Sequence, residues 1–146
     1  MYHTILVPVD GSKRAEAILP HVEELARRYD AKVVFLQVVE RTPIIIGPET
    51  AYVGQYQEEL EQRTKDAELY LERMKEKFQE RQIEARTRVA YGPVVEAIIF
   101  AAESEDADLI AIASHGRSGL SRVFYGSVAA GMLHRVDRPL LLIRSG

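Results

Sequence analysis

Five short apolar segments recur along the chain, and each has the length of a β-strand. The segments at 4–9 and 31–39 are nearly continuous, the pattern of strands that are buried on both faces of a sheet. The segment at 83–91 alternates between apolar and charged residues, which predicts an outer strand with one face in water. Two further apolar segments, 107–113 and 138–144, predict the fourth and fifth strands.

Helical periodicity occupies the intervals between these segments. Ser12 is suited to cap a first helix that runs to about Tyr29 with one apolar face. Pro20 inside that helix should remove one backbone hydrogen bond, at a cost of up to ~3 kcal/mol. Three further helices are expected at about 56–81, from Pro93 to about Glu105, and at 127–136.

Residues 40–55 form the least regular segment, because two prolines and two glycines interrupt it. Its PIII stretch (43–46) is too apolar for a free linker. We expect a loop that folds against the body of the domain, with a lid or a subunit contact as the alternative.

The alternation of five strands with four helices predicts an α/β fold: a single Rossmann-like domain over residues 1–146, with a parallel sheet covered by helices on both faces. The strand order 3-2-1-4-5 places the most apolar strands in the centre and the alternating strand at an edge. In that order the winding reverses between the first and fourth strands, where ligands bind in open α/β sheets. The segments that meet there are PVDGS (8–12) and SHGRSGLSRVFYGSVA (114–129).

Composition narrows the classes of function. The 146 residues carry a formal net charge of −3, which argues against a general nucleic-acid-binding protein. Cysteine is absent, which removes disulfides and thiolate catalysis and suits a reducing cytoplasm. The N-terminus lacks the pattern of a signal peptide, and no apolar run approaches the ~20 residues that cross a bilayer. We therefore expect a cytoplasmic protein without membrane insertion.

The segment 114–129 has the residue types of a phosphate-binding loop. Gly116 and Gly119 would let backbone amides approach a ligand. Gly126 and Ser127 are expected at the start of the fourth helix, where free amides and the helix dipole favour an anion. A flexible loop followed by a helix cap is the alternative, since neither GxxxxGK[ST] nor a GxGxxG after the first strand is present.

Two stretches resemble the universal stress protein family: ILVPVDGS (5–12) and ASHGRSGLSRVFYGSVAAGMLHRVDRPLLLIR (113–144). The resemblance extends over essentially the whole chain and points to the ATP-binding branch. The pattern of that branch is Gly, two residues, Gly, nine residues, and Gly followed by Ser or Thr. Here Gly116, Gly126 and Ser127 match, but Ala113 takes the place of the first glycine. Its methyl group would come close to ribose or phosphate, and we expect it to be tolerated.

The resemblance implies an adenine nucleotide site with a role for each matching residue. The nucleoside would lie among Pro8, Val9, Asp10, Val38, Ile112 and Ala113. The phosphates would lie among Gly116, Arg117, Gly119, Gly126, Ser127 and Val128. Within these sets, the Asp10 carboxylate would approach ribose or a metal-bound phosphate, and Val38 would meet adenine through its backbone. Magnesium is the expected ion, because ATP adds negative charge to a chain that is already acidic.

The resemblance also implies a stress-response protein that holds ATP, hydrolyses it slowly at most, and so regulates an unidentified protein partner. It implies a homodimer with 138–144 as the contact. The residues themselves show no credible catalytic constellation, and the four histidines have no metal-ligand spacing.

Three alternatives belong to other classes of function. An adaptor of the same family would bind its partner without nucleotide, through the apolar PIIIGP segment (43–48). A phospho-acceptor receiver domain would require an acidic cluster after the first strand and a lysine after the fifth, and this chain has neither. An ATP-cleaving synthetase would require an SGGxDS-like loop after the first strand, which the chain also lacks.

Overall fold

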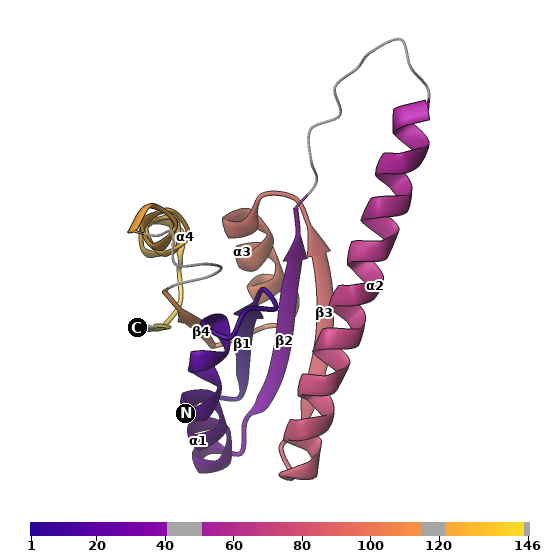
Figure 1. The fold of residues 1–146 in the computed structure, drawn as a ribbon. Coiled ribbons are helices and arrows are strands. Elements are labelled where there is room, and N and C mark those ends of the chain that lie inside the picture. The colour runs from indigo at the N-terminus through magenta and orange to yellow at the C-terminus, as the bar shows by residue number, and fades with distance from the viewer. Residues whose placement is uncertain (41–50, 115–121, 145–146) are drawn as a thin grey trace.

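Five parallel strands form the central sheet of the computed structural model, which describes residues 1–40, 51–114 and 122–144 (Figure 1). The strands are β1 (Thr4–Val9), β2 (Lys32–Val39), β3 (Ala85–Tyr91), β4 (Leu109–Ala113) and β5 (Leu140–Ile143). They pair in the order β3-β2-β1-β4-β5, and every pair is parallel. The predicted fold class and strand order are confirmed, and the alternating strand β3 lies at an edge as expected.

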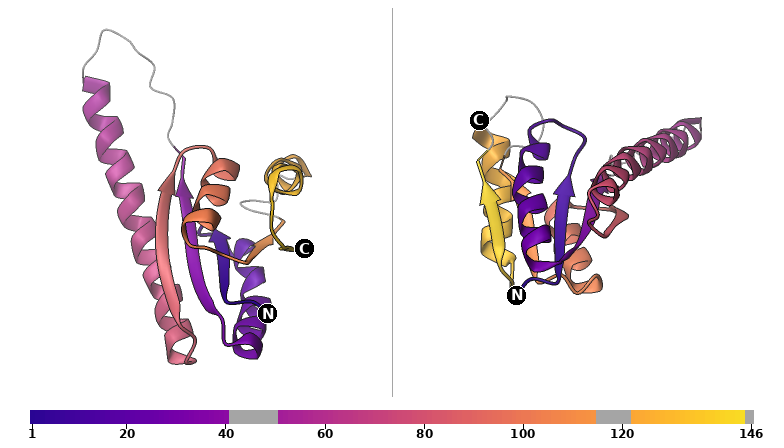
Figure 2. Two further views of the ribbon diagram at one scale, coloured as in Figure 1. Left: turned by 180° about the vertical axis from the view of Figure 1, so that it is seen from behind. Right: turned by 90° about the horizontal axis from the view of Figure 1, so that it is seen from below.

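Helices cover both faces of the sheet, as the views from behind and from below show (Figure 2). They are the short 3-10 helix η1 (Ala15–Ile18) and the α-helices α1 (Leu19–Tyr29), α2 (Ala51–Glu80), α3 (Val94–Ser104) and α4 (Arg122–Arg135). Side chains of η1, α1 and α2 share one core with the sheet, and side chains of α3 and α4 share the other. We call the two sides of the sheet the α1/α2 face and the α3/α4 face.

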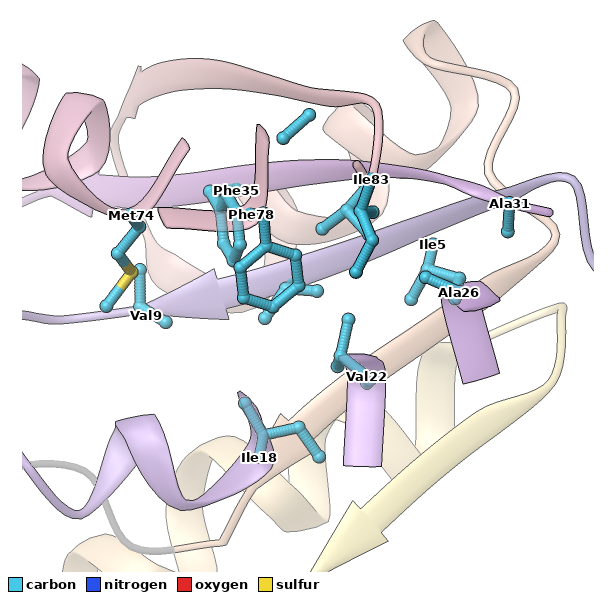
Figure 3. Close-up of a cluster of buried hydrophobic side chains, with 14 of the residues drawn as sticks. Ile5, Val9, Ile18, Val22, Ala26, Ala31, Phe35, Met74, Phe78 and Ile83 are labelled. Carbon is cyan, nitrogen blue, oxygen red and sulfur yellow. The ribbon is translucent and has the colours of Figure 1, made fainter. Parts of the chain in front are cut away.

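Successive residues of the central strands enter the two cores in turn. In β1, Val7 packs on the α1/α2 face, whereas Leu6 packs on the α3/α4 face. On the α1/α2 face, Phe78 of α2 meets Phe35 of β2 edge to face, with ring centroids 4.9 Å apart (Figure 3). Burial on both faces is the reason why these strands have continuous apolar sequences.

The first helix is divided in two, and this removes the expected cost of Pro20. The 3-10 helix ends at Ile18 and α1 begins at Leu19, so Pro20 lies in the first turn of α1. The amide that a proline lacks has no partner within the helix at that position. Ser12 Oγ accepts a hydrogen bond from the Ala15 amide at 3.1 Å, so Ser12 stabilises the turn that leads into the 3-10 helix, whose N-cap residue is Arg14.

Two other helices begin earlier than the sequence predicted. The helix α2 begins at Ala51, and its 30 residues extend past the carboxyl edge of the sheet (Figure 1). The predicted start of α4 at residue 127 is wrong, because α4 begins at Arg122. A glycine inside a helix costs only about 1 kcal/mol relative to alanine, so Gly126 does not interrupt it. The prediction for 40–55 falls mostly on residues outside the described ranges.

The helices α3 and α4 approach each other closely at Gly131. A Cβ atom at this position would lie 2.8 Å from Cγ2 of Val95 in α3, well inside normal contact distance. Nearby, Arg135 donates to the Glu96 carboxylate at 2.7 Å, and this hydrogen bond lowers the pKa of Glu96. The glycine therefore fixes how closely α4 packs against α3.

Candidate functional site

The winding of the sheet reverses between β1 and β4, and these two strands pair over only two residues. Their register joins Ile5 to Leu109 and Leu6 to Ile110, and no later pair is recorded between them although both strands continue. The strands β1 and β2, in contrast, pair along the whole of β1. The carboxyl halves of β1 and β4 are therefore not joined by a hydrogen-bonded ladder.

Pro8 explains why this ladder stops. The Thr4 carbonyl accepts a hydrogen bond from the Asp108 amide at 3.0 Å, on the side of β4. Because successive residues of a strand direct their backbone groups to opposite neighbours, Leu6 and Pro8 also face β4. Pro8 has no N–H to donate, so the hydrogen bond that would follow Leu6 in this ladder is missing. A proline in a central strand thus interrupts the ladder at the point where the winding of the sheet reverses, and we call this interruption between β1 and β4 the opening.

Four of the predicted site residues share the α3/α4 face beside this opening. Ile112 belongs to the core on that face, and Val38 and Val128 pack against it. Pro8 is buried and lies two residues after Leu6 in β1, so its side chain lies on the same face as that of Leu6. The structure therefore brings together apolar residues from β1, β2, β4 and α4 that are far apart in the sequence.

Val9 and Ala113 do not join this group, because their side chains pack on the α1/α2 face. The backbone atoms of Val9 and Ala113 lie in the sheet itself and border both faces. Ala113 is buried, and its methyl group points into the opposite core. The methyl group that replaces the first glycine of the pattern therefore does not occupy the α3/α4 side of the opening.

Asp10 follows β1, and the turn after it holds its carboxylate in place. Its Oδ1 accepts hydrogen bonds from the Ser12 amide at 2.9 Å and from the Ser12 hydroxyl at 2.6 Å. Gly11 between them has a φ of +86°, which side chains of L-residues rarely adopt. Within the part of the chain that the structure describes, Asp10 Oδ2 accepts no hydrogen bond. One carboxylate oxygen thus orients the side chain, and Oδ2 has no partner among the described residues.

The predicted phosphate residues have mixed outcomes. Gly116, Arg117 and Gly119 lie outside the described residues, so their role stays a prediction. Gly126 and Ser127 lie in the second turn of α4, where amides are bonded to carbonyls four residues earlier. The expectation that they supply the free amides of a helix start is therefore wrong. The unbonded amides of α4 belong to the residues around Arg122.

Sequence reasoning missed polar groups that are buried near this edge. Ser114 follows β4 directly and is only 7% exposed, and its Oγ has no hydrogen-bond partner among the residues that the structure describes. Gln37, which is in register with Val9, has a buried Oε1 without a partner. Nε and Nη2 of Arg63 in α2 are buried and unpartnered as well. A polar residue within or directly after a buried apolar run was the available signal for the first two.

The comparisons with known proteins agree with the observed fold. The model of the universal stress protein family matches residues 1–144. The chain belongs to this family. A similar protein is universal stress protein MJ0577 of Methanocaldococcus jannaschii, which is 26% identical over 99% of this chain and 96% of its own. Its solved structure superimposes with a TM-score of 0.86 and covers 100% of this chain and 98% of that one.

Two solved members of the family carry a nucleotide. A universal stress protein family protein of Arabidopsis thaliana with AMP bound has a TM-score of 0.69 at 17% identity, and the match covers 99% of this chain and 92% of that one. A universal stress protein in complex with cAMP has a TM-score of 0.63 at 20% identity, covering 99% and 98%. At these identities the likeness to this universal stress protein is one of fold.

On the α1/α2 face of this universal stress protein, a hydrogen bond links α2 to the segment that follows Asp10. The Tyr70 hydroxyl donates to Glu16 Oε2 at 2.7 Å. Burial raises the pKa of Tyr70 well above its usual range, and the carboxylates of Glu16 and Asp10 raise it further. The phenol therefore stays protonated at neutral pH and keeps its bond to Glu16.

Other features of this universal stress protein do not form a second site. Over the described ranges, no group of three or more histidine or carboxylate side chains could hold a metal ion, and no helix is long and apolar enough to cross a membrane. A cavity of about 690 Å³ lies at the amino edge of the sheet, near the ends of α1 and α2. The cations that line it include Arg27 and Arg81, which pair with the Glu23 carboxylate of α1 at 3.2 Å and 2.7 Å.

Proposed function

We propose that this protein binds an adenine nucleotide at the carboxyl ends of β1, β2 and β4, as a member of the ATP-binding branch of its family. The observation that carries the proposal is the opening that Pro8 leaves between β1 and β4, with the oriented Asp10 carboxylate beside it. Ligands of open α/β sheets bind at such a reversal of winding. The AMP and cAMP carried by two proteins of the same fold support the choice of nucleotide.

The nucleoside would use the residues that surround the opening. The apolar side chains of Pro8, Val38, Ile112 and Val128 suit a planar base, and the backbone of Val38 would meet the polar edge of adenine. Asp10 would accept a hydrogen bond from ribose or approach a phosphate. The phosphate tail would extend toward Gly116, Arg117 and Gly119.

ATP with magnesium is the proposed ligand, and the described residues fit a metal that the nucleotide itself brings. Mg²⁺ prefers oxygen ligands and commonly combines one or two carboxylates with phosphate oxygens and water. The Oδ2 atom of Asp10 supplies one such carboxylate oxygen. Mg²⁺ would there neutralise charge on the phosphates.

The cellular role would be that of a cytoplasmic stress-response regulator. A single domain over residues 1–146 would change its contact with a protein partner when nucleotide is bound, with slow ATP hydrolysis at most and with no nucleic acid involved. A homodimer through β5 would cover the apolar edge of the sheet, because an uncovered edge strand of Leu140–Ile143 would invite aggregation.

Isothermal titration of the folded protein with Mg-ATP tests the proposal. We expect binding at or below millimolar nucleotide, and weaker Mg²⁺-dependent binding in Asp10→Asn. Asp137→Asn is the matched control, because Asp137 is exposed and remote from the carboxyl ends of the strands. A folded wild-type protein that gives no heat with ATP, ADP or AMP at millimolar concentration would contradict the proposal and favour the adaptor without nucleotide.

A further inference from the structure

Ser114 combines deep burial with a hydroxyl group that has no partner. Its side chain is 7% exposed, and within the described ranges Oγ makes no hydrogen bond. Its backbone is well placed, since the Ser114 amide donates to the Ile143 carbonyl of β5 at 2.7 Å. The backbone therefore continues the sheet for one residue beyond β4, and the unpaired hydroxyl does not result from a displaced backbone.

The position of Ser114 in this extension indicates the side of the sheet on which its hydroxyl lies. In β4, Ile110 and Ile112 belong to the α3/α4 face, whereas Ala111 and Ala113 belong to the other face. Continued alternation puts Ser114 in line with Ile112, on the face that carries Val38 and Val128. The hydroxyl is then a single polar group beside the apolar lining of the opening.

In the protein without a ligand, an unpaired buried hydroxyl lowers the free energy of unfolding. Leaving such a group without a hydrogen bond costs roughly 1–3 kcal/mol relative to its solvated state. Replacing it with a methyl group of similar shape is then nearly neutral or stabilising. A ligand that supplies the missing partner recovers this cost, and sites of this kind reject analogues that lack the partner.

We propose that the Ser114 hydroxyl determines base specificity by donating a hydrogen bond to a ring nitrogen of the bound purine. This inference rests on the proposed function, since it assigns a partner within the same nucleotide site. A ring nitrogen is the group that fits, because it is an uncharged acceptor on a planar ring that apolar side chains can flank. A phosphate is excluded as the partner by its charge, which would remain uncompensated among apolar neighbours.

The experiment measures binding and stability in the wild type, in Ser114→Ala and in Ser104→Ala. Ser104 ends α3 and is exposed, so its substitution is the matched control. The probes are AMP and its 1-deaza, 3-deaza and 7-deaza analogues, titrated calorimetrically. We expect the wild type to bind one deaza analogue about tenfold more weakly than AMP. Ser114→Ala should bind AMP and that analogue with the same reduced affinity, and Ser104→Ala should behave as the wild type.

The stability of the variants gives an independent result. Because the hydroxyl is unpaired in the free protein, Ser114→Ala should unfold at the same urea concentration as the wild type or a higher one. A Ser114→Ala protein that is clearly destabilised or unfolded would show that the hydroxyl already has a partner, and would overturn the inference.

The binding results separate the failure of this inference from the failure of the proposed function. If the wild type binds no AMP, ADP or ATP, both fail. If the wild type binds AMP and Ser114→Ala binds it equally well, or loses affinity for all four probes by the same factor, the nucleotide site stands and the role of Ser114 is overturned.

Discussion

The contact of α3 with α4 at Gly131 leads to a prediction about the stability of Gly131→Ala. Whether this change stabilises or destabilises the protein depends on a single neighbour, Val95. In an isolated helix, Gly→Ala is stabilising by about 1 kcal/mol, because alanine has the higher helix propensity. At Gly131 the new Cβ would stand 2.8 Å from Cγ2 of Val95, whereas carbon atoms pack best at about 3.5–4.0 Å. Val95 is branched at Cβ and has little freedom to turn away. We therefore expect Gly131→Ala to be destabilising.

The magnitude follows from two opposed contributions. Overpacking of this kind costs typically 1–3 kcal/mol, against the gain of about 1 kcal/mol from helix propensity. The net loss in the free energy of unfolding should therefore lie between about 0 and 2 kcal/mol. Val95→Ala removes the clashing methyl and leaves only the Val95 Cβ, at 3.7 Å, which is an ordinary contact. In that background the same Gly131→Ala change should be stabilising by about 1 kcal/mol.

Urea unfolding followed by far-UV circular dichroism on the four proteins of this double-mutant cycle measures the coupling between the two sites. We expect a coupling of about 1–3 kcal/mol, with Val95→Ala alone as the reference for lost packing. If Gly131→Ala is equally stabilising in both backgrounds, then α3 and α4 are not in contact at this position and the reasoning is refuted.

Three further predictions test the opening, the buried phenol and the start of the sheet. Pro8→Ala restores an amide that can extend the ladder to β4. AMP should then bind about tenfold more weakly by calorimetry. Because the pKa of Tyr70 is raised in the folded protein, its stabilising effect is full below pH 10, the usual tyrosine value, and is lost above it. Tyr70→Phe should therefore reduce the fall of unfolding free energy above pH 10 by up to about 1.4 kcal/mol per pH unit. Asp108→Ala removes the carboxylate that accepts the amides of His3 and Thr4, and should lower the free energy of unfolding by about 1–3 kcal/mol in urea.

Each of these predictions has a matched control and a contrary result. Pro139→Ala is the same change outside the opening, and equal affinity of Pro8→Ala and wild type for AMP would refute the role of Pro8. Tyr29→Phe is the same change in α1, and identical pH slopes for Tyr70→Phe and wild type would contradict the assignment. Glu103→Ala removes an exposed carboxylate, and an equally small effect of Asp108→Ala would show that its hydrogen bonds contribute nothing.

Strand positions and strand order could be predicted from the sequence, because burial on both faces leaves a signal that needs no tertiary information. A continuous apolar run such as residues 4–9 has few alternatives to an interior strand, and the alternation in 83–91 similarly marks an edge. With short right-handed connections, the order 3-2-1-4-5 satisfies those patterns. The position where the winding reverses follows from that order.

Helix starts were less predictable, because glycine, proline and serine have several uses that sequence alone does not separate. Pro20 was expected to interrupt a helix, but it lies in a first turn, where it is favourable. Gly126 and Ser127 were expected to begin α4, but they lie inside it. The loss of about 1 kcal/mol at an internal glycine is smaller than the packing energy of a helix against a sheet, so tertiary contacts decide the outcome.

The location of the candidate site could be predicted from the sequence, but the face of the sheet that each site residue occupies was not. Matching positions to a family pattern assigned Val9, Ala113 and Ile112 to one nucleoside site without reference to the direction of their side chains. Alternation within the strands separates them: Ile112 lies on the α3/α4 face, and the other two lie on the α1/α2 face. The same alternation, applied one residue further along β4, would have pointed to Ser114.

The division between the two faces has a consequence for how a nucleotide could be held. The α3/α4 face offers apolar side chains and one unpaired hydroxyl, which suit an uncharged ring. The carboxylate of Asp10 is oriented by Ser12, and its negative charge contributes to the raised pKa of Tyr70 on the α1/α2 face. Charged groups are costly to bury among apolar side chains, so a nucleotide that places its base on the first face must direct its phosphates away from it. Both faces meet at the carboxyl ends of β1 and β4, where Pro8 interrupts the ladder and Asp10 follows β1.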